Sequence, residues 1–323
     1  MTLLANNQHN ETACPMKKTS IGGQALIEGI MMRGPEMTAM AVRNPEGEIV
    51  LEKWPTKSTF KGKFFKLPII RGVFNFIDSM RFGYKCLMRS AEIAGLEDEE
   101  PKKDGKSGGI GQVGMNILMV ISSILGVLLA VVLFMWLPVQ LYSWVEDAVP
   151  TIDGNRFLKS LCEGLLRIAI FLGYMLLMTR MKDIRRTFEY HGAEHKTIFC
   201  YEKGLPLTVE NVREQRRFHP RCGTSFMVLM LIVGIFISMF ISPDLHPVLR
   251  TGIKLLTLPL VVGIGYELIK LAGRVDNWLT RAISAPGTWM QHLTVLEPDD
   301  AMIECAITAF KEVLPEDEKR AEW

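Results

Sequence analysis

The feature that most constrains this chain is a long segment without charge. No charged residue occurs from residue 107 to residue 145, and the core of this segment, residues 115–139, can cross about 30 Å of hydrocarbon as a helix. Residues 223–242 form a second uncharged segment of spanning length. Both segments predict transmembrane helices, so the chain is expected to be an integral membrane protein.

Two further apolar segments, residues 158–179 and 253–272, contain charged residues. In the first of them, Glu163 precedes Arg167 by four residues, which is the favourable order for an ion pair on one helix. Together the four segments predict a mainly α, polytopic membrane protein with about four transmembrane helices.

The charges of the loops predict the orientation of these helices. Residues 180–221, between the second and third predicted spans, are rich in arginine and lysine, whereas the loops 146–156 and 243–250 carry one arginine each. Loops rich in positive charge stay on the cytoplasmic side of a membrane. We therefore expect residues 180–221 and both termini to be cytoplasmic.

The polar parts of the chain predict a small cytoplasmic α+β portion. Residues 38–42 and 48–54 flank the turn signal NPEG, which predicts a β-hairpin. An apolar stripe over residues 302–314 follows several acidic residues and predicts a capped helix. The expected parts are an N-terminal region with the hairpin and an amphipathic helix (1–95), a flexible linker (96–112), a transmembrane bundle (113–273) with a cytoplasmic loop (180–222), and a C-terminal cytoplasmic helical region (274–323).

Composition narrows the classes of partner. A net charge of only +2 argues against a nucleic-acid-binding protein, which would carry a stronger basic excess. The six cysteines form no C-x-x-C pair, and most lie in predicted cytosolic or membrane segments, where thiols stay reduced. The lipid bilayer is the partner that the sequence predicts.

Residues 189–195, EYHGAEH, contain the pattern H-x-x-E-H. Two histidines four residues apart lie on one face of a helix, so His191 and His195 can both reach one metal ion. Glu194 could then act as the general base on a metal-bound water, as in the inverted zincin pattern. The alternative is a charged cytosolic helix whose histidines are solvated.

His219 and Cys222 lie three residues apart at the start of the third predicted span. They are expected on the same membrane surface as the H-x-x-E-H motif, and imidazole and thiolate are both good zinc ligands. Alternatively, this pair belongs to a turn with an inert thiol. Glu267, in the fourth predicted span, is a further candidate ligand because a carboxylate at membrane depth is costly; its alternative role is an ion pair with Lys270.

Two arrangements of these ligands compete. Four protein ligands would close the site and make it structural, whereas three would leave a water position and allow hydrolysis. The glycine-rich residues 22–35 do not match a phosphate loop, because no G-K-[ST] follows. A structural turn is expected there, although Glu28 and Arg33 could serve the site.

Four segments, GGQALIEGIMMRGP, EYHGAEHKTIFCYE, LTVENVR and HPRCGTSF, together resemble a bacterial membrane-protein family. The family is catalogued as domain of unknown function 1385 and is labelled a predicted metal-dependent enzyme. The resemblance runs from about residue 21 to residue 309. It implies a multi-pass protein of the bacterial inner membrane with a metal site at His191, Glu194, His195, His219 and Cys222.

The leading functional expectation is a metal-dependent hydrolase that acts on a membrane or juxtamembrane substrate at the cytoplasmic face. A divalent ion, zinc by preference, would be held by His191 and His195, with Cys222, His219 or Glu267 completing the shell. The alternative is a non-catalytic membrane scaffold or regulator stabilised by the metal. A transporter is less favoured, because the spans lack a chain of polar residues at the midplane and no internal repeat is evident.

Overall fold

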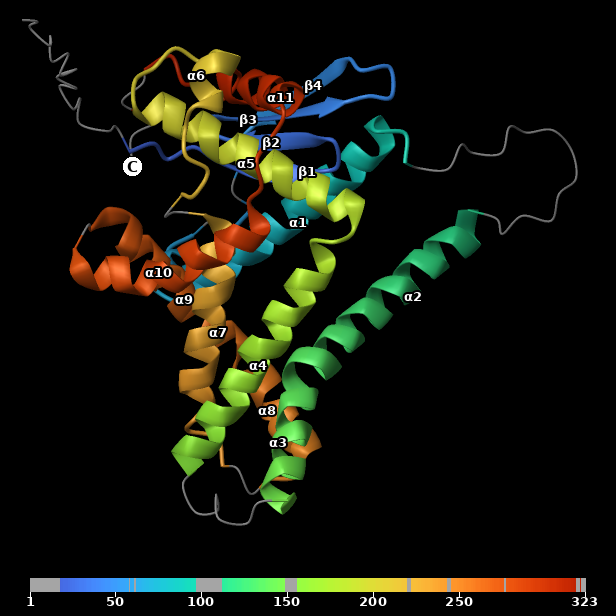
Figure 1. Ribbon diagram of the computed structural model, residues 1–323, viewed down its shortest axis with the longest axis vertical. Coiled ribbons are helices and arrows are strands. Elements are labelled where there is room, and N and C mark those ends of the chain that lie inside the picture. The colour runs from blue at the N-terminus through green and yellow to red at the C-terminus, as the bar shows by residue number, and fades with distance from the viewer. Residues whose placement is uncertain are drawn as a thin grey trace, which may run out of the picture.

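The structure, a computed structural model, describes residues 18–57, 59–60, 62–96, 112–148, 156–219, 222–242, 245–275, 277–317 and 320. Figure 1 shows two parts, a sheet with flanking helices at one end and a bundle of long helices at the other. Most of the predicted linker 96–112 lies outside the described residues.

The sheet is an antiparallel meander in the order β1-β2-β3-β4. The predicted hairpin is confirmed by the last two strands, in which Val42 pairs with Val50. Its turn closes through the Gly47 N–H, which donates to the Asn44 carbonyl at 3.0 Å, and Gly47 adopts a φ of +89° that favours glycine. The glycine-rich segment 22–35 is a second hairpin. The strands are β1 (Gly22–Leu26), β2 (Gly29–Arg33), β3 (Met37–Arg43) and β4 (Ile49–Pro55).

Side chains alternate between the two faces of each strand, and apolar side chains lie on both faces of this sheet. Helices cover both faces. Ile30 and Met32 are in the core with α5 (Lys182–Glu202) and α11 (Asp300–Lys311). Met31 faces the opposite side, where α1 packs. The C-terminal helix is capped as predicted, since the Asp299 side chain accepts the Met302 N–H at 2.8 Å. The shorter elements of this part are η1 (Phe64–Lys66) and α6 (Val209–Arg213).

Helix α1 (Ile70–Ile93) joins the sheet to the bundle. Its far end contributes Cys86 to the core beneath the sheet. Its first turn packs on α9 (Leu258–Arg274), where a Cβ at Gly72 would lie 2.7 Å from Tyr266. The predicted amphipathic helix therefore exists, and it connects the two parts of the molecule.

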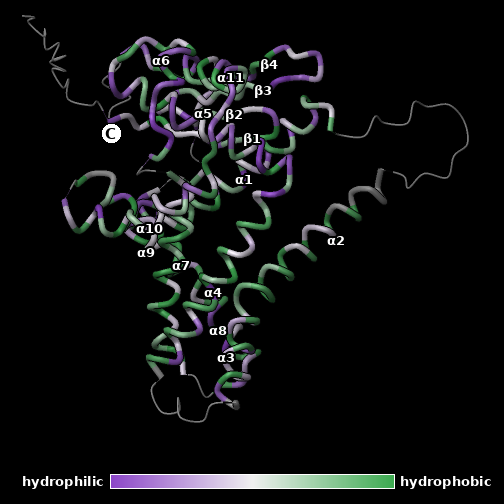
Figure 2. Tube along the Cα trace, in the orientation of Figure 1, coloured by the Kyte–Doolittle hydropathy of each residue, from purple (hydrophilic) through white to green (hydrophobic). Residues whose placement is uncertain are grey.

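Two helical stretches are long and apolar enough to cross a membrane. The first, Val120–Glu146, runs without interruption through α2 (Gln112–Val131), η2 (Val132–Trp136), a π-helical turn, and α3 (Leu137–Ala148). The second, Phe157–Met178, makes up nearly all of α4 (Arg156–Met178). Figure 2 shows hydrophobic residues along α2 and α4.

The predicted count of four spans is not confirmed. Helix α7 (Gly223–Ser238) has 16 residues, about 24 Å of helix, which is shorter than the usual hydrocarbon core. Helices α8 (Pro247–Leu256) and α9 (Leu258–Arg274) bend by 45° and qualify only as one broken span. Pro259, which lacks an N–H, lies beside this bend. The described residues thus hold two candidate spans, or three if the bent pair is counted.

Candidate metal centre

His191, His195 and Cys222 each place one ligand atom within 4.8 Å of the others. The two histidines lie one turn apart on α5, and their ring centroids are 4.5 Å apart. Cys222 is the N-cap of α7, and its Sγ lies 3.1 Å from His191 Nε2. A helix of the sheet part and a helix of the bundle therefore meet at this cluster. It is the one group of three or more such ligands within the described residues, and we call these three residues the triad.

Backbone carbonyls orient both imidazoles. His191 Nδ1 lies 3.0 Å from the Thr294 carbonyl, and His195 Nδ1 lies 2.5 Å from the Arg217 carbonyl. A carbonyl can only accept a hydrogen bond, so each Nδ1 carries the proton in these contacts. That tautomer leaves each Nε2 free to bind a metal, an arrangement common around metal-ligating histidines.

Gly192 allows the backbone after α10 (Trp278–Thr294) to lie against α5. A Cβ at Gly192 would lie 1.9 Å from the Leu296 carbonyl oxygen, so no other residue fits without rearrangement. The Leu296 N–H donates to the Phe188 carbonyl at 2.9 Å. This close approach brings the Thr294 carbonyl to His191.

Gln291, on α10, fixes the segment that leads to Cys222. Its side chain accepts the His219 N–H at 2.8 Å and donates to the His219 carbonyl at 2.7 Å. It also contacts Ser225 Oγ at 3.2 Å, and the side chain is fully buried. No sequence pattern predicts this role of Gln291, because one glutamine in an amphipathic helix carries no signal of its own.

His219 lines a small cavity together with His195 and Cys222, but it does not belong to the group of three ligands. Its Nε2 lies 3.5 Å from Glu202 Oε2, and its ring packs on Phe199 with centroids 4.6 Å apart. Glu202 also accepts the Thr19 N–H at 2.9 Å. The structure therefore separates His219 from the triad and assigns it a carboxylate partner that sequence reasoning did not find.

Glu267 is paired with Arg71 of α1, whose Nε donates to Glu267 Oε1 at 2.7 Å. The structure does not bring it into the triad, and its carboxylate forms an ion pair with Arg71. Arg71 lies 196 residues away in sequence, so no local sequence pattern predicts this partner. Glu267 links α9 to α1 through this ion pair and does not belong to the predicted set of metal ligands.

Glu194 is buried at the edge of the triad. The Gly23 N–H donates a hydrogen bond to its carboxylate, and a Cβ at Gly23 would lie 2.9 Å from Glu194 Cδ. Burial raises the pKa of Glu194, while the neighbouring His191 and the Gly23 N–H oppose that rise. Burial lowers the pKa of His195, which favours the neutral imidazole that metals bind.

A cavity of about 120 Å³ lies beside these groups. Such a space has room for a few water molecules and for polar contacts to them. Glu194 therefore shares one small cavity with two of the three candidate ligands. It is lined by Thr19, Ser20, Ile21, Gly22, Gly23, Glu194, His195, Ile198, His219, Cys222 and Gly223.

Comparisons with known proteins agree with the resemblance found in the sequence. YqhQ of Bacillus subtilis (strain 168), described as an uncharacterized protein, is 36% identical over 300 residues, which cover 91% of this chain and 92% of that protein. No solved structure matches the chain. The profile of the family described as "Protein of unknown function (DUF1385)" matches residues 67–316. The chain therefore belongs to the DUF1385 family.

Proposed function

We propose that this protein is a metal-dependent hydrolase that acts on a membrane or juxtamembrane substrate. The observation that carries the proposal is the convergence of His191, His195 and Cys222 within 4.8 Å, beside a cavity that Glu194 also lines. Cys222 comes from a different helix, so sequence proximity alone does not place it beside the two histidines.

The ligand set fits zinc. Two neutral imidazoles and a thiolate are borderline-soft ligands, and zinc prefers them in tetrahedral sites. Three protein ligands leave one position for water or substrate. Zinc bound there would polarise a substrate carbonyl or phosphoryl group and lower the pKa of a bound water.

Glu194 is the residue we assign to proton transfer. Its carboxylate is held by the Gly23 N–H and faces the cavity beside His195. From there it can accept the proton of the attacking water and later pass it to the leaving group. The Thr294 and Arg217 carbonyls keep both imidazoles in position while this happens.

His219 favours a second candidate, a structural metal site in a non-catalytic membrane scaffold. Its ring lines the cavity, with its centroid 5.7 Å from that of His195. Movement of this ring toward the triad would supply a fourth protein ligand and close the site.

We further propose that the protein resides in the bacterial inner membrane, with the sheet part and both termini in the cytoplasm. The arginine- and lysine-rich segment between α4 and α7 supports this orientation. The metal centre would then lie at the cytoplasmic end of the bundle.

The test combines metal analysis with complementation of a deletion strain by the full-length protein. We expect about one zinc per chain in the wild type, and loss of zinc in His191→Ala, His195→Ala and Cys222→Ala. His292→Ala, which changes an exposed histidine of α10, is the matched control and should keep its zinc.

Glu194→Gln distinguishes the two candidates. A hydrolase should keep its zinc but fail to complement, because the glutamine cannot take the proton. Glu189→Gln, on the same helix and paired with Arg185, should complement normally. Full complementation by Glu194→Gln with zinc retained would refute the hydrolase. Loss of zinc in His219→Gln would instead support the closed, structural site.

A further inference from the structure

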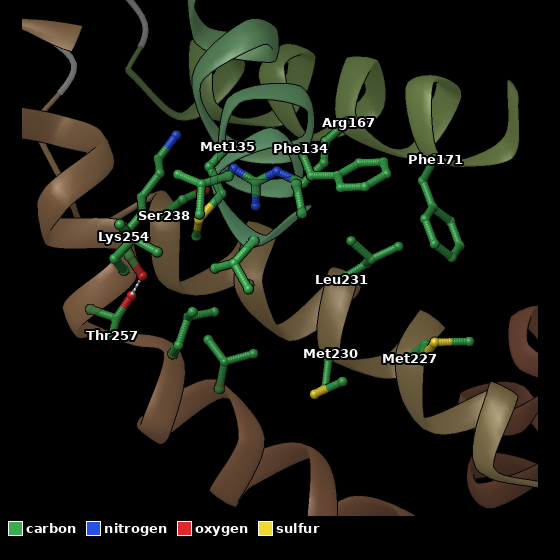
Figure 3. Close-up of a pocket in the computed structure, with 17 residues that line it drawn as sticks. Phe134, Met135, Arg167, Phe171, Met227, Met230, Leu231, Ser238, Lys254 and Thr257 are labelled. Atoms are coloured by element: carbon green, nitrogen blue, oxygen red, sulfur yellow. Dashed lines mark hydrogen bonds between the residues drawn. The ribbon is translucent and has the colours of Figure 1, made fainter. Parts of the chain in front are cut away.

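A second cavity, of about 410 Å³, lies inside the helical bundle, apart from the metal centre. Its walls come from α2, η2, α4, α7, α8 and α9 (Figure 3). Small-molecule sites in proteins commonly have volumes of about 300–1,000 Å³, so the space is large enough for a ligand.

The cavity has a polar side and an apolar side. In Figure 3, Lys254, Ser238 and Thr257 lie on one side, while Phe171 and Met227 lie on the other. Most of the remaining lining is aliphatic or aromatic. This distribution matches a ligand with a polar head and an apolar chain.

The positive charges at the polar side of the cavity outnumber the negative charges. Glu163 of α4 pairs with both Arg250 and Lys254 of α8, and Lys254 Nζ lies 3.0 Å from Glu163 Oε2. The predicted pair of Glu163 with Arg167 is therefore replaced by contacts to another helix. Among the described residues, the cluster contains three cations, Arg167, Arg250 and Lys254, and one carboxylate.

Arg167 is the unpaired member of this cluster. It is 7% exposed, its Nε is buried without a hydrogen-bond partner, and no ion pair is formed by its guanidinium within the described residues. Figure 3 shows the guanidinium reaching into the cavity. Its NH1 lies 3.8 Å from where a Cβ at Gly234 of α7 would stand.

A cation buried among apolar helices without a directly paired carboxylate is unfavourable, so such a residue usually has a partner or a function. A single negative charge beside Arg167 would offset part of the excess. Because the rest of the cavity is apolar, the ligand that satisfies both requirements is an amphipathic anion.

We propose that this cavity binds one anionic phospholipid, with its phosphate beside Arg167 and an acyl chain along the apolar side. Arg250 lies in the first turn of α8, Lys254 lies in its last turn, and Glu163 lies in the third turn of α4. The first turns of α4 and α8 are at the end of the bundle away from the sheet (Figure 1). Arg250 is the member of the cluster nearest that end, so we expect the lipid to enter from the leaflet there.

The experiment is a titration of the purified full-length protein in mild detergent, read by native mass spectrometry. The probes are phosphatidylglycerol, phosphatidylcholine and oleate. The wild type should bind one phosphatidylglycerol at least about tenfold more tightly than phosphatidylcholine. In Arg167→Gln this preference should fall to about twofold or less.

Two further variants complete the design. Lys159→Gln removes a cation of α4 that pairs with Glu146 and does not line the cavity, so the lipid preference should be unchanged. Gly234→Leu fills the space beside Arg167 without altering charge, so lipid binding should be lost. Zinc content should be unaffected in all three variants, because the two sites are separate.

Several results would overturn the proposal. Equal binding of phosphatidylglycerol and phosphatidylcholine by the wild type would show that Arg167 selects no anion. If Arg167→Gln kept the preference for phosphatidylglycerol over phosphatidylcholine, Arg167 would likewise not be the residue that selects the anion. Tighter binding of oleate than of phosphatidylglycerol would replace the phospholipid with a fatty acid, and a lipid-free dimer would identify a second copy of the chain as the occupant.

Discussion

Gly192 allows the three candidate metal ligands to assemble. It lies between His191 and Glu194 on α5, at the point where the backbone after α10 touches the helix. Glycine has a low intrinsic helix propensity, so its presence inside a helix calls for a reason. The reason here is the Leu296 carbonyl oxygen, which occupies the space of a Cβ.

Gly192→Ala should therefore disrupt the site although it improves helix propensity. The new methyl group would meet the Leu296 carbonyl at 1.9 Å and force the segment away from α5. We expect a loss of stability of about 2 kcal/mol or more, together with loss of zinc, because the Thr294 carbonyl would leave His191. Thermal unfolding and zinc analysis in detergent measure both effects.

Gly173→Ala is the matched control, because Gly173 lies in a helix with open space where its Cβ would stand. That substitution should leave zinc content unchanged and should not destabilise the protein. If Gly192→Ala retained both its zinc and its unfolding temperature, the close approach would have no role in building the site.

At the scale of single residues, the sequence predicted those site residues that are marked by a short spacing along the chain. His191 and His195 are four apart on one helix, and that spacing alone places them on one face. The contacts of Gln291 and Glu202 could not be predicted, because their partners are 72 and 183 residues away. Glu267 was predicted at the metal from its cost in the membrane, but Arg71 offsets that cost.

Among the elements, the first hairpin and α5 are held together by charge. The turn between β1 and β2 places Glu28 at a φ of +48°, and Arg186 of α5 donates to its carboxylate, with one contact at 2.5 Å. The Tyr190 hydroxyl donates to the same carboxylate at 3.3 Å. The hairpin therefore docks on the helix that carries the histidines.

This contact predicts a dependence of stability on pH. The hydrogen bonds from Arg186 lower the pKa of Glu28, although burial opposes them. A lowered pKa means that the contribution is present above the unfolded-state pKa of about 4.3 and is lost as the pH falls through the folded-state value. The carboxylate is partly exposed, so the contribution should be about 1 kcal/mol or less.

Chemical unfolding of the wild type and Glu28→Gln, compared at pH 7 and at progressively lower pH, measures this effect. The difference in unfolding free energy should shrink below about pH 4. Glu46→Gln, in the exposed turn between β3 and β4, is the control and should differ little from the wild type at any pH. A Glu28→Gln difference that does not change with pH would contradict the ion pair.

The membrane helices show why element boundaries are harder to predict than element types. Apolar composition correctly indicated helices at residues 223–242 and 253–272. It could not show that α7 ends after 16 residues, or that the chain bends by 45° between α8 and α9. Those features depend on where neighbouring helices supply partners, as Ser160 does for the Ser238 carbonyl at 3.3 Å.

At the scale of the whole molecule, the candidate metal centre lies where the sheet part meets the bundle. Its ligands come from α5 on the sheet side and from the N-cap of α7 on the bundle side. The lipid cavity lies within the bundle (Figures 1 and 3). In the proposed orientation, the candidate metal centre lies at the cytoplasmic end of the bundle, and the first turn of α8 lies at the opposite end.

That arrangement predicts which residues an impermeant reagent can reach. His246→Cys places a thiol at the exposed N-cap of α8, at the bundle end away from the sheet. Glu46→Cys places one in the exposed turn of the sheet part. In intact cells, an impermeant maleimide should label His246→Cys and not Glu46→Cys, and both should react after permeabilisation.

The native thiols set the background of this experiment. Cys86, Cys200, Cys222 and Cys305 are buried, so their failure to react carries no information about orientation. The two introduced thiols differ mainly in the side of the membrane that they report, since both positions are exposed. Labelling of Glu46→Cys in intact cells, with His246→Cys protected until permeabilisation, would reverse the orientation. The candidate metal centre would then lie outside the cytoplasm, where a thiol such as Cys222 is open to oxidation and is a poor choice of zinc ligand.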